Sequence, residues 1–123
     1  MSRIVPVKTT GICLSEGDSV VVGTQASGAS GTTWTVPPPT TGGAGRDVTF
    51  NTDGVTSMTT LTTDLECSSD GGTTWDKFKT SMALIATSTG AAVVVSNVNP
   101  AMIYRINNTS TTGTSCSVLA TVS

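Results

Sequence analysis

The sequence contains no histidine, little charge and few aromatic side chains. Without histidine, a Ser-His-Asp triad cannot form and a zinc site is nearly excluded. Charged residues account for 11% of the chain, whereas an average soluble domain has about 25%. The formal net charge is −2 and the six basic residues are scattered. This balance argues against a phosphate-binding surface, so no nucleic-acid partner is expected.

Long apolar runs, helical periodicity and paired cysteines are also missing. The first apolar run, residues 4–7, is too short for a signal peptide and contains a proline. No run reaches the length of a transmembrane helix, so no membrane partner is expected. The three cysteines form no C-x-x-C pair. Cys67 and Cys116 are in phase with apolar strand positions, which favours buried free thiols over a disulfide. No metal or other cofactor is expected.

Valine, threonine and serine are abundant instead, and short strand patterns alternate with turn residues along the chain. No segment shows a sustained 3.6-residue period with helix caps. About eight or nine short strands predict an all-β fold, namely an antiparallel β-sandwich of the immunoglobulin-like or jelly-roll kind. The length of 123 residues predicts a single domain over 1–123. A propeller is excluded because no repeat of roughly 40–50 residues is present.

The clearest strand pattern lies immediately before residue 68. Apolar and polar side chains alternate there, which indicates one buried face and one solvated face. The positions expected inside are Leu61, Thr63, Leu65 and Cys67, and those expected outside are Thr60, Thr62, Asp64 and Glu66.

Other segments predict further strands and turns. Residues 19–22 are a β-branched run that predicts a strand covered on both faces. Residues 51–54 have the composition of a turn, and residues 107–114 have that of a polar loop. The last strand places four side chains on one face, namely Cys116, Val118, Ala120 and Val122.

The stretch 68–75 follows the clearest strand and predicts a hairpin. Asp70 can accept hydrogen bonds from the backbone of its own turn, and Gly71 and Gly72 can take positive φ. Trp75 can fold back over the turn. The stretch matches the Asp-box pattern S-x-D-x-G-x-T-W at every specified position: Ser68, Asp70, Gly72, Thr74 and Trp75. In sialidase-like propellers this motif is structural, and the resemblance favours a structural role over a ligand site here.

Two segments outside the regular strand pattern are candidates for contacts between proteins. Residues 1–10 are expected to form an extended N-terminal arm, with Arg3, Ile4 and Val5 as possible interface residues; a frayed terminus is the equal alternative. Residues 23–46 are rich in glycine, proline and threonine and are expected to form a long loop. Trp34 in this loop is either an interface anchor or, slightly favoured, a core residue on a short strand.

Paired carboxylates are the only candidates for chemistry. Asp64 and Glu66 are two residues apart on one strand, which places them within about 7 Å. Such a pair could perform acid–base chemistry on a glycoside or bind calcium. A solvated strand face is the favoured interpretation, and no nucleophile has a base beside it. The chain is therefore not expected to be an enzyme.

The second half of the chain carries four features of one kind of protein. They are the strand ending at residues 65–67, the hairpin 68–75, the strand 104–107 and the final strand 118–123. Together they resemble small β-sandwich structural proteins of tailed bacteriophages. The resemblance implies a virion protein of the capsid decoration or cement type. Its implied partners are the major capsid protein or other virion proteins, and it is expected to be a homo-oligomer.

A second class of function stays open from the residues alone. The chain could be a carbohydrate-binding or host-recognition module of a phage neck or tail protein. In that case Trp34 or Tyr104 would stack on a sugar. The scarcity of aromatic residues counts against this alternative.

Overall fold

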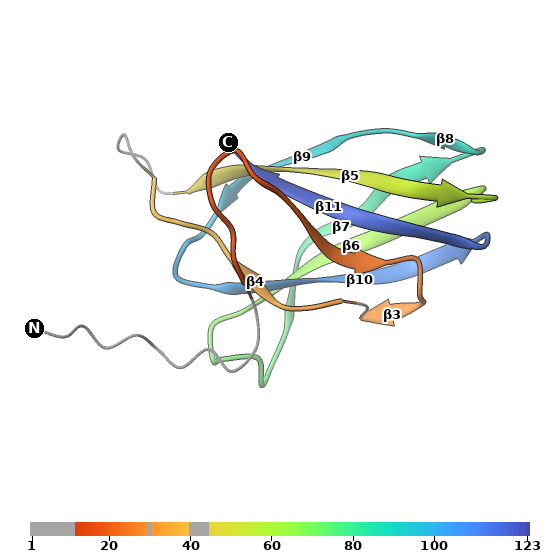
Figure 1. Cartoon of the computed structure of the whole chain (residues 1–123). Helices are drawn as coiled ribbons and strands as arrows, with labels where there is room; N and C mark the ends of the chain where they lie inside the picture. The colour runs from red at the N-terminus through yellow and green to blue at the C-terminus, as the bar shows by residue number, and fades with distance from the viewer. Residues whose placement is uncertain (1–11, 30, 40–44) are drawn as a thin grey trace, which may run out of the picture.

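The computed structural model describes residues 12–29, 31–39 and 45–123, which form two stacked β-sheets (Figure 1). The strands are β1 (Ile12–Cys13), β2 (Ser19–Thr24), β3 (Gly28–Ala29), β4 (Trp34–Thr35), β5 (Arg46–Thr56), β6 (Thr60–Ser68), β7 (Asp76–Ala86), β8 (Thr89–Gly90), β9 (Val93–Val98), β10 (Ile103–Thr112) and β11 (Ser115–Val122). Within these ranges, no helix has the length and apolar character that crossing a membrane requires.

The strand order confirms the predicted antiparallel sandwich. One sheet has the order β1-β4-β10-β6-β7-β8, with β3 paired to β10, and the other has the order β2-β11-β5-β9. The described strand pairs are antiparallel except for β1 with β4. The strands outnumber the prediction because some, such as β3 and β8, have two residues each, too few to leave a periodic pattern in the sequence.

Aromatic side chains fill the space between the sheets. The ring of Trp34 stacks on Tyr104 with centroids 5.2 Å apart and contacts Phe50 at 5.9 Å. Phe78 meets the edge of Tyr104 at 5.5 Å. Trp34, Phe50 and Tyr104 are fully buried. The structure therefore places Trp34 in the core, on β4, and the alternative of an exposed interface anchor is wrong.

The predicted turn at 51–54 and residues 107–112 of the predicted loop 107–114 are strand in the structure, whereas residues 113–114 do form a connection between strands. β5 continues through 51–54 because it pairs with β11, and β10 continues to Thr112 because it pairs with β6. The chain turns at Gly113, where φ is 144° and a Cβ atom would lie 2.5 Å from Met58. Local turn composition was therefore overridden by pairing with strands distant in the sequence.

Two further predictions are corrected at the edges of the fold. The run 19–22 lies in β2, an edge strand, and Val21 is 50% exposed, so its two faces are not both covered. The segment 23–46 holds the end of β2, then β3 and β4, instead of one long loop. Residues 1–10, predicted as an arm, lie outside the described residues.

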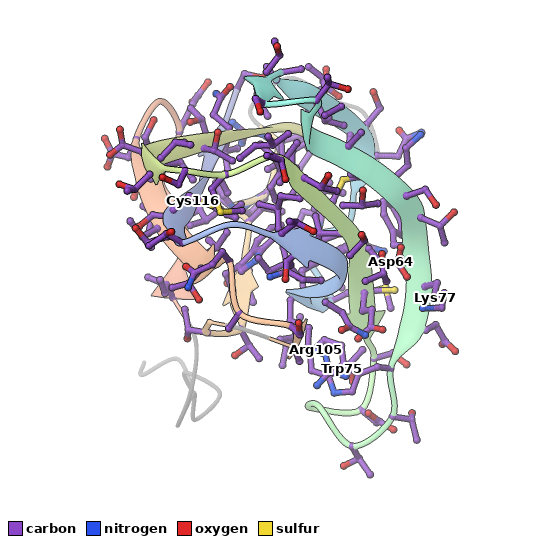
Figure 2. All side chains as sticks on the ribbon, turned by 90° about the vertical axis from the view of Figure 1, so that its right-hand side faces the viewer. Asp64, Trp75, Lys77, Arg105 and Cys116 are labelled. Atoms are coloured by element: carbon purple, nitrogen blue, oxygen red, sulfur yellow. The ribbon has the colours of Figure 1, made fainter. Side chains whose placement is uncertain are left out.

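The cysteines behave as free thiols. Cys67 and Cys116 are buried and unpaired, whereas Cys13 is exposed. Burial raises the pKa of both Cys67 and Cys116. Figure 2 shows Cys116 well away from the hairpin end of the molecule, where Trp75 lies.

Candidate functional site

The hairpin between β6 and β7 is organised by Asp70. Its Oδ1 accepts hydrogen bonds from the backbone N–H groups of Thr73 at 3.0 Å and Thr74 at 2.9 Å. Its two carboxylate oxygens also accept from the hydroxyls of Ser68 and Thr74. The Ser68 hydroxyl accepts from the backbone N–H of Gly72 at 2.9 Å. These bonds fix the loop through groups within the motif itself.

The same bonds set the charge of Asp70. Hydrogen bonds from Thr74, and then from Ser68, hold the pKa of Asp70 well below its ordinary value. Gly71 and Gly72 have φ of 78° and 100°, the region in which a glycine avoids the strain of a side chain. The carboxylate is thus an internal acceptor committed to its own turn.

Trp75 joins this hairpin to the neighbouring strand β10. Its indole N–H donates to the carbonyl of Gly72 at 3.0 Å, which folds the ring over the turn. The guanidinium of Arg105 lies 4.2 Å from the centroid of the ring, a cation–π contact. Figure 2 shows Arg105 and Trp75 side by side at this end of the molecule.

Replacing Asp70 with alanine is expected to lower the melting temperature by several degrees. The substitution leaves the N–H groups of Thr73 and Thr74 without their acceptor and releases the loop. Thermal unfolding followed by circular dichroism measures the effect, with Ser69→Ala as the control in the same loop. Unchanged stability together with the loss of a binding activity would show that the hairpin is a ligand site.

A strip of charged side chains lies beside the hairpin, on the outer face of the seven-stranded sheet. Lys77 Nζ is 2.7 Å from Asp64 Oδ2 and 3.8 Å from Glu66 Oε2. The backbone N–H of Ser81 also donates to Asp64, at 2.9 Å. Figure 2 shows Asp64 and Lys77 facing each other from adjacent strands.

The other side of this strip is closed by β10. Arg105 Nε donates to Glu66 Oε1 at 2.8 Å, and Asn107 Nδ2 donates to Oε2 at 2.9 Å. Asp64 is 5% exposed and Glu66 is 6% exposed. The prediction of a solvated face for these carboxylates is therefore wrong. The reason is that β6 lies between β7 and β10, whose long polar side chains close over it.

The protonation states in this strip favour ion pairing over proton transfer. Burial raises the pKa of Asp64, but the hydrogen bonds from Lys77 and Ser81 outweigh it and leave the pKa lowered. Burial acts on Glu66 in the same way and is outweighed by Asn107 and Arg105, so its pKa is also lowered. The hydrogen bond to Asp64 raises the pKa of Lys77.

The side chains of Asp64, Glu66 and Lys77 are consequently all charged near neutral pH. A general acid needs a carboxyl group that holds its proton at the working pH, and a nucleophilic amine needs to lose one. The strip provides neither, because each carboxylate is paired with a cation. In the described ranges, no group of three His, Cys, Asp or Glu residues is arranged to hold a metal ion. The arrangement can therefore fix β6, β7 and β10 to one another by ion pairs.

Sequence reasoning missed the partners of these carboxylates. The alternation of Arg105 and Asn107 with Tyr104 and Ile106 is visible in the sequence. It shows that the two polar residues share a face, but not which strand lies beside them. The register supplies the missing information, since Arg105 lies opposite Glu66.

A second surface is the outer face of the four-stranded sheet, here called the β2–β9 face. Its side chains alternate along the strands with buried residues such as Val48, Phe50 and Val118. Val21 and Val94 are 50% and 56% exposed on its two edge strands. The outward-facing side chains at its centre, on β5 and β11, are uncharged: Thr49, Asn51, Ser117, Leu119 and Thr121. Ser19, Val21 and Val94 on the two edge strands are also uncharged.

The remaining site residues predicted from the sequence fall in different places. The structure brings Ser68, Asp70, Gly72 and Thr74 together in the hairpin, with Trp75 over it. Arg3, Ile4 and Val5 lie outside the described residues.

A comparison with protein-family models, with curated proteins and with solved structures found no match to the chain.

Proposed function

We propose that the chain is a non-enzymatic structural protein of a tailed-phage virion, of the capsid decoration or cement type. The observation that supports this proposal is the β2–β9 face. It is a four-stranded surface with an uncharged centre and two exposed valines. Covering a surface of this kind requires no charge to leave water, so its desolvation costs less than that of a charged surface.

The partners in this proposal are the major capsid protein or other virion proteins, together with further copies of the chain. A weakly charged protein is a solubility risk as a free monomer, and burial in an assembly removes that risk. The core also supports a passive role, since its aromatic residues are packed against one another and the strip over β6 is closed by ion pairs.

The structure argues against the carbohydrate-binding alternative, which depended on exposed aromatic side chains at Trp34 or Tyr104. Trp34 and Tyr104 are fully buried between the sheets, so neither can stack on a sugar. The hydroxyl of Tyr104 is used as well, since it accepts a hydrogen bond from the backbone N–H of Asn99 at 2.6 Å. Trp75 keeps partial exposure, but Arg105 lies over its ring.

The double substitution Val21→Lys and Val94→Lys is expected to weaken binding to the assembled shell by about tenfold or more, since two charges would have to be desolvated. Co-sedimentation of the purified chain with shells that lack it measures the binding. Val55→Lys is the control, because Val55 is 48% exposed but lies beyond the face, near the end of β5. Unchanged binding by the double variant, or a monomer that binds glycans on an array, would contradict the proposal.

A further inference from the structure

We propose that β9 is the contact through which two copies of the chain bind each other. In this dimer, β9 of one copy pairs antiparallel with β9 of the second copy, so that two four-stranded sheets become one continuous sheet. The inference rests on the proposed function in one respect, namely that the chain binds further copies of itself. It adds the strand that makes this contact and its register.

β9 is an edge strand with one free side. It is the last strand in the order β2-β11-β5-β9, and in the described part of the chain it pairs only with β5 (Figure 1). No hydrogen bond between described residues joins the backbone on its other side to a neighbouring strand. The N–H and C=O groups along such an edge are a template for a further strand.

Two other long edge strands, β7 and β2, are protected against such pairing. β7 carries the exposed Lys77 and Lys79, and its pairing with β6 has three register shifts. β2 is covered by the segment that follows it. Gly31 lies so close that a Cβ atom on it would be 2.1 Å from the carbonyl oxygen of Val22. Charges, bulges and covering segments are the devices by which proteins prevent edges from pairing.

The part of β9 before Asn97 has none of these devices. Asn97 has a φ of 62° and lies at a register shift with β5, so the regular strand ends there. Residues 92–96 read Ala-Val-Val-Val-Ser, and no charged residue occurs anywhere in 80–104. Ala92, Val94 and Ser96 are exposed, whereas Val95 is buried. This segment is therefore an uncharged and largely β-branched edge that suits a further strand.

The segment 92–96 is complementary to itself. A two-fold axis at Val94 places Val94 opposite its own copy and Ala92 opposite Ser96, and the symmetric contact closes as a dimer. Val94 is 56% exposed, so the pairing removes apolar surface from water. Asp47 on β5 lies opposite the end of this segment. The two copies of Asp47 are at least three strand spacings, about 14 Å, apart, which exceeds the screening length of about 8 Å.

The contact is short, so the dimer should be weak in dilute solution. A pairing over residues 92–96 covers less surface than the roughly 1,200–2,000 Å² of a stable interface. Copies held side by side on a shell are at high effective concentration, which promotes such a pairing. The two β2–β9 faces then lie on the same side of the joined sheet and form one larger docking surface.

A cysteine at position 94 tests the register, because only a residue on the two-fold axis lies beside its own copy. The variant is Cys13→Ser/Val94→Cys, which removes the exposed native cysteine. Mild oxidation should give a disulfide-linked dimer, since directly opposite residues have Cβ atoms about 4.5–5.5 Å apart. Cys13→Ser/Val21→Cys is the control, because Val21 is 50% exposed on the other edge strand. It should form dimer at least about tenfold more slowly.

Charges at the opposed positions 92 and 96 test the same pairing without a cross-link. Ala92→Lys/Ser96→Lys places lysine opposite lysine twice and should weaken dimerisation by about tenfold or more. Ala92→Glu/Ser96→Lys is its matched control, since it places opposite charges together and should preserve the dimer. Sedimentation velocity of the full-length chain, over protein concentrations up to its solubility limit, measures the association.

Three results would each overturn the inference. The first is a wild-type chain that is monomeric at every concentration, which would leave the edge to a strand of another protein. The second is a pair of charge variants that associate equally. The third is a cysteine at position 21 that forms dimer as fast as one at position 94.

These measurements use the purified chain without shells, so they separate the dimer from the proposed function. A chain that dimerises through β9, but whose shell binding is unaffected by Val21→Lys/Val94→Lys, contradicts the proposed function alone. A monomeric chain whose shell binding is lost in that variant overturns the dimer alone.

Discussion

Replacing Trp34 with alanine should lower the free energy of unfolding by about 3–5 kcal/mol, the usual cost of removing a large buried aromatic side chain. Trp34 is fully buried and contacts both Tyr104 and Phe50, so its removal leaves a cavity between the sheets. Because domains are stable by about 5–15 kcal/mol, the variant should be close to unfolding at 37 °C. Chemical denaturation followed by intrinsic fluorescence measures the change.

Trp34→Phe is the matched control for this variant. The indole N–H of Trp34 is buried and has no hydrogen-bond partner in the described part of the chain, so phenylalanine sacrifices no hydrogen bond there. It should cost much less than alanine and leave assembly intact. A Trp34→Ala variant that has normal stability but no longer assembles would contradict this prediction and would show that Trp34 is an interface anchor.

Acid should destabilise the protein as the pH falls below about 4. The pKa values of Asp64 and Glu66 are lowered in the folded chain, whereas unfolded carboxyl groups titrate at about 3.9 and 4.3. The stabilising contribution is therefore present above the unfolded pKa and is lost as the pH falls through the folded pKa. A decrease of several degrees in melting temperature between about pH 6 and pH 3 is expected.

The double variant Asp64→Asn/Glu66→Gln tests the origin of this acid sensitivity. Its amides do not titrate, so its stability at neutral pH should be lower and its dependence on pH shallower than that of the wild type. The remaining acid sensitivity should come partly from Asp70, whose pKa is also lowered. Wild-type and variant chains with parallel pH profiles would show that the ion pairs over β6 do not contribute.

Features that depend on neighbours in the sequence could be predicted without a structure. The hairpin 68–75 is fixed by hydrogen bonds within itself, which the backbone N–H groups of Thr73 and Thr74 donate to Asp70, so its residue types are sufficient to predict it. The face shared by Cys116, Val118, Ala120 and Val122 follows from alternation alone, and all four residues are buried.

Features that depend on strands distant in the sequence could not be predicted in this way. Asp64 and Glu66 were expected on a solvated face. To predict their burial, one would have to know that β6 is a central strand, flanked by Lys77 on one side and Arg105 on the other. The pattern of alternation is the same for a half-exposed strand and for one whose outer face is covered by its neighbours. Residues 51–54 show the same effect, since turn-forming residue types become strand where β11 pairs with them.

The two outer faces of the sandwich therefore differ in character. One is neutralised by ion pairs among β6, β7 and β10 and ends at the tryptophan-capped hairpin. The other has an uncharged centre and an acidic rim formed by Asp47 and Asp53. This asymmetry is the basis for assigning the contacts between proteins to the β2–β9 face.

A reconstruction by cryo-electron microscopy of the assembly to which the proposed function assigns this chain would test that assignment most directly. We predict that protein density covers the β2–β9 face in every copy, with Val21 and Val94 inside the contact, and that the hairpin makes no contact with a ligand. A reconstruction in which this face is open to solvent, while the hairpin or the charged strip holds the partner, would contradict the account.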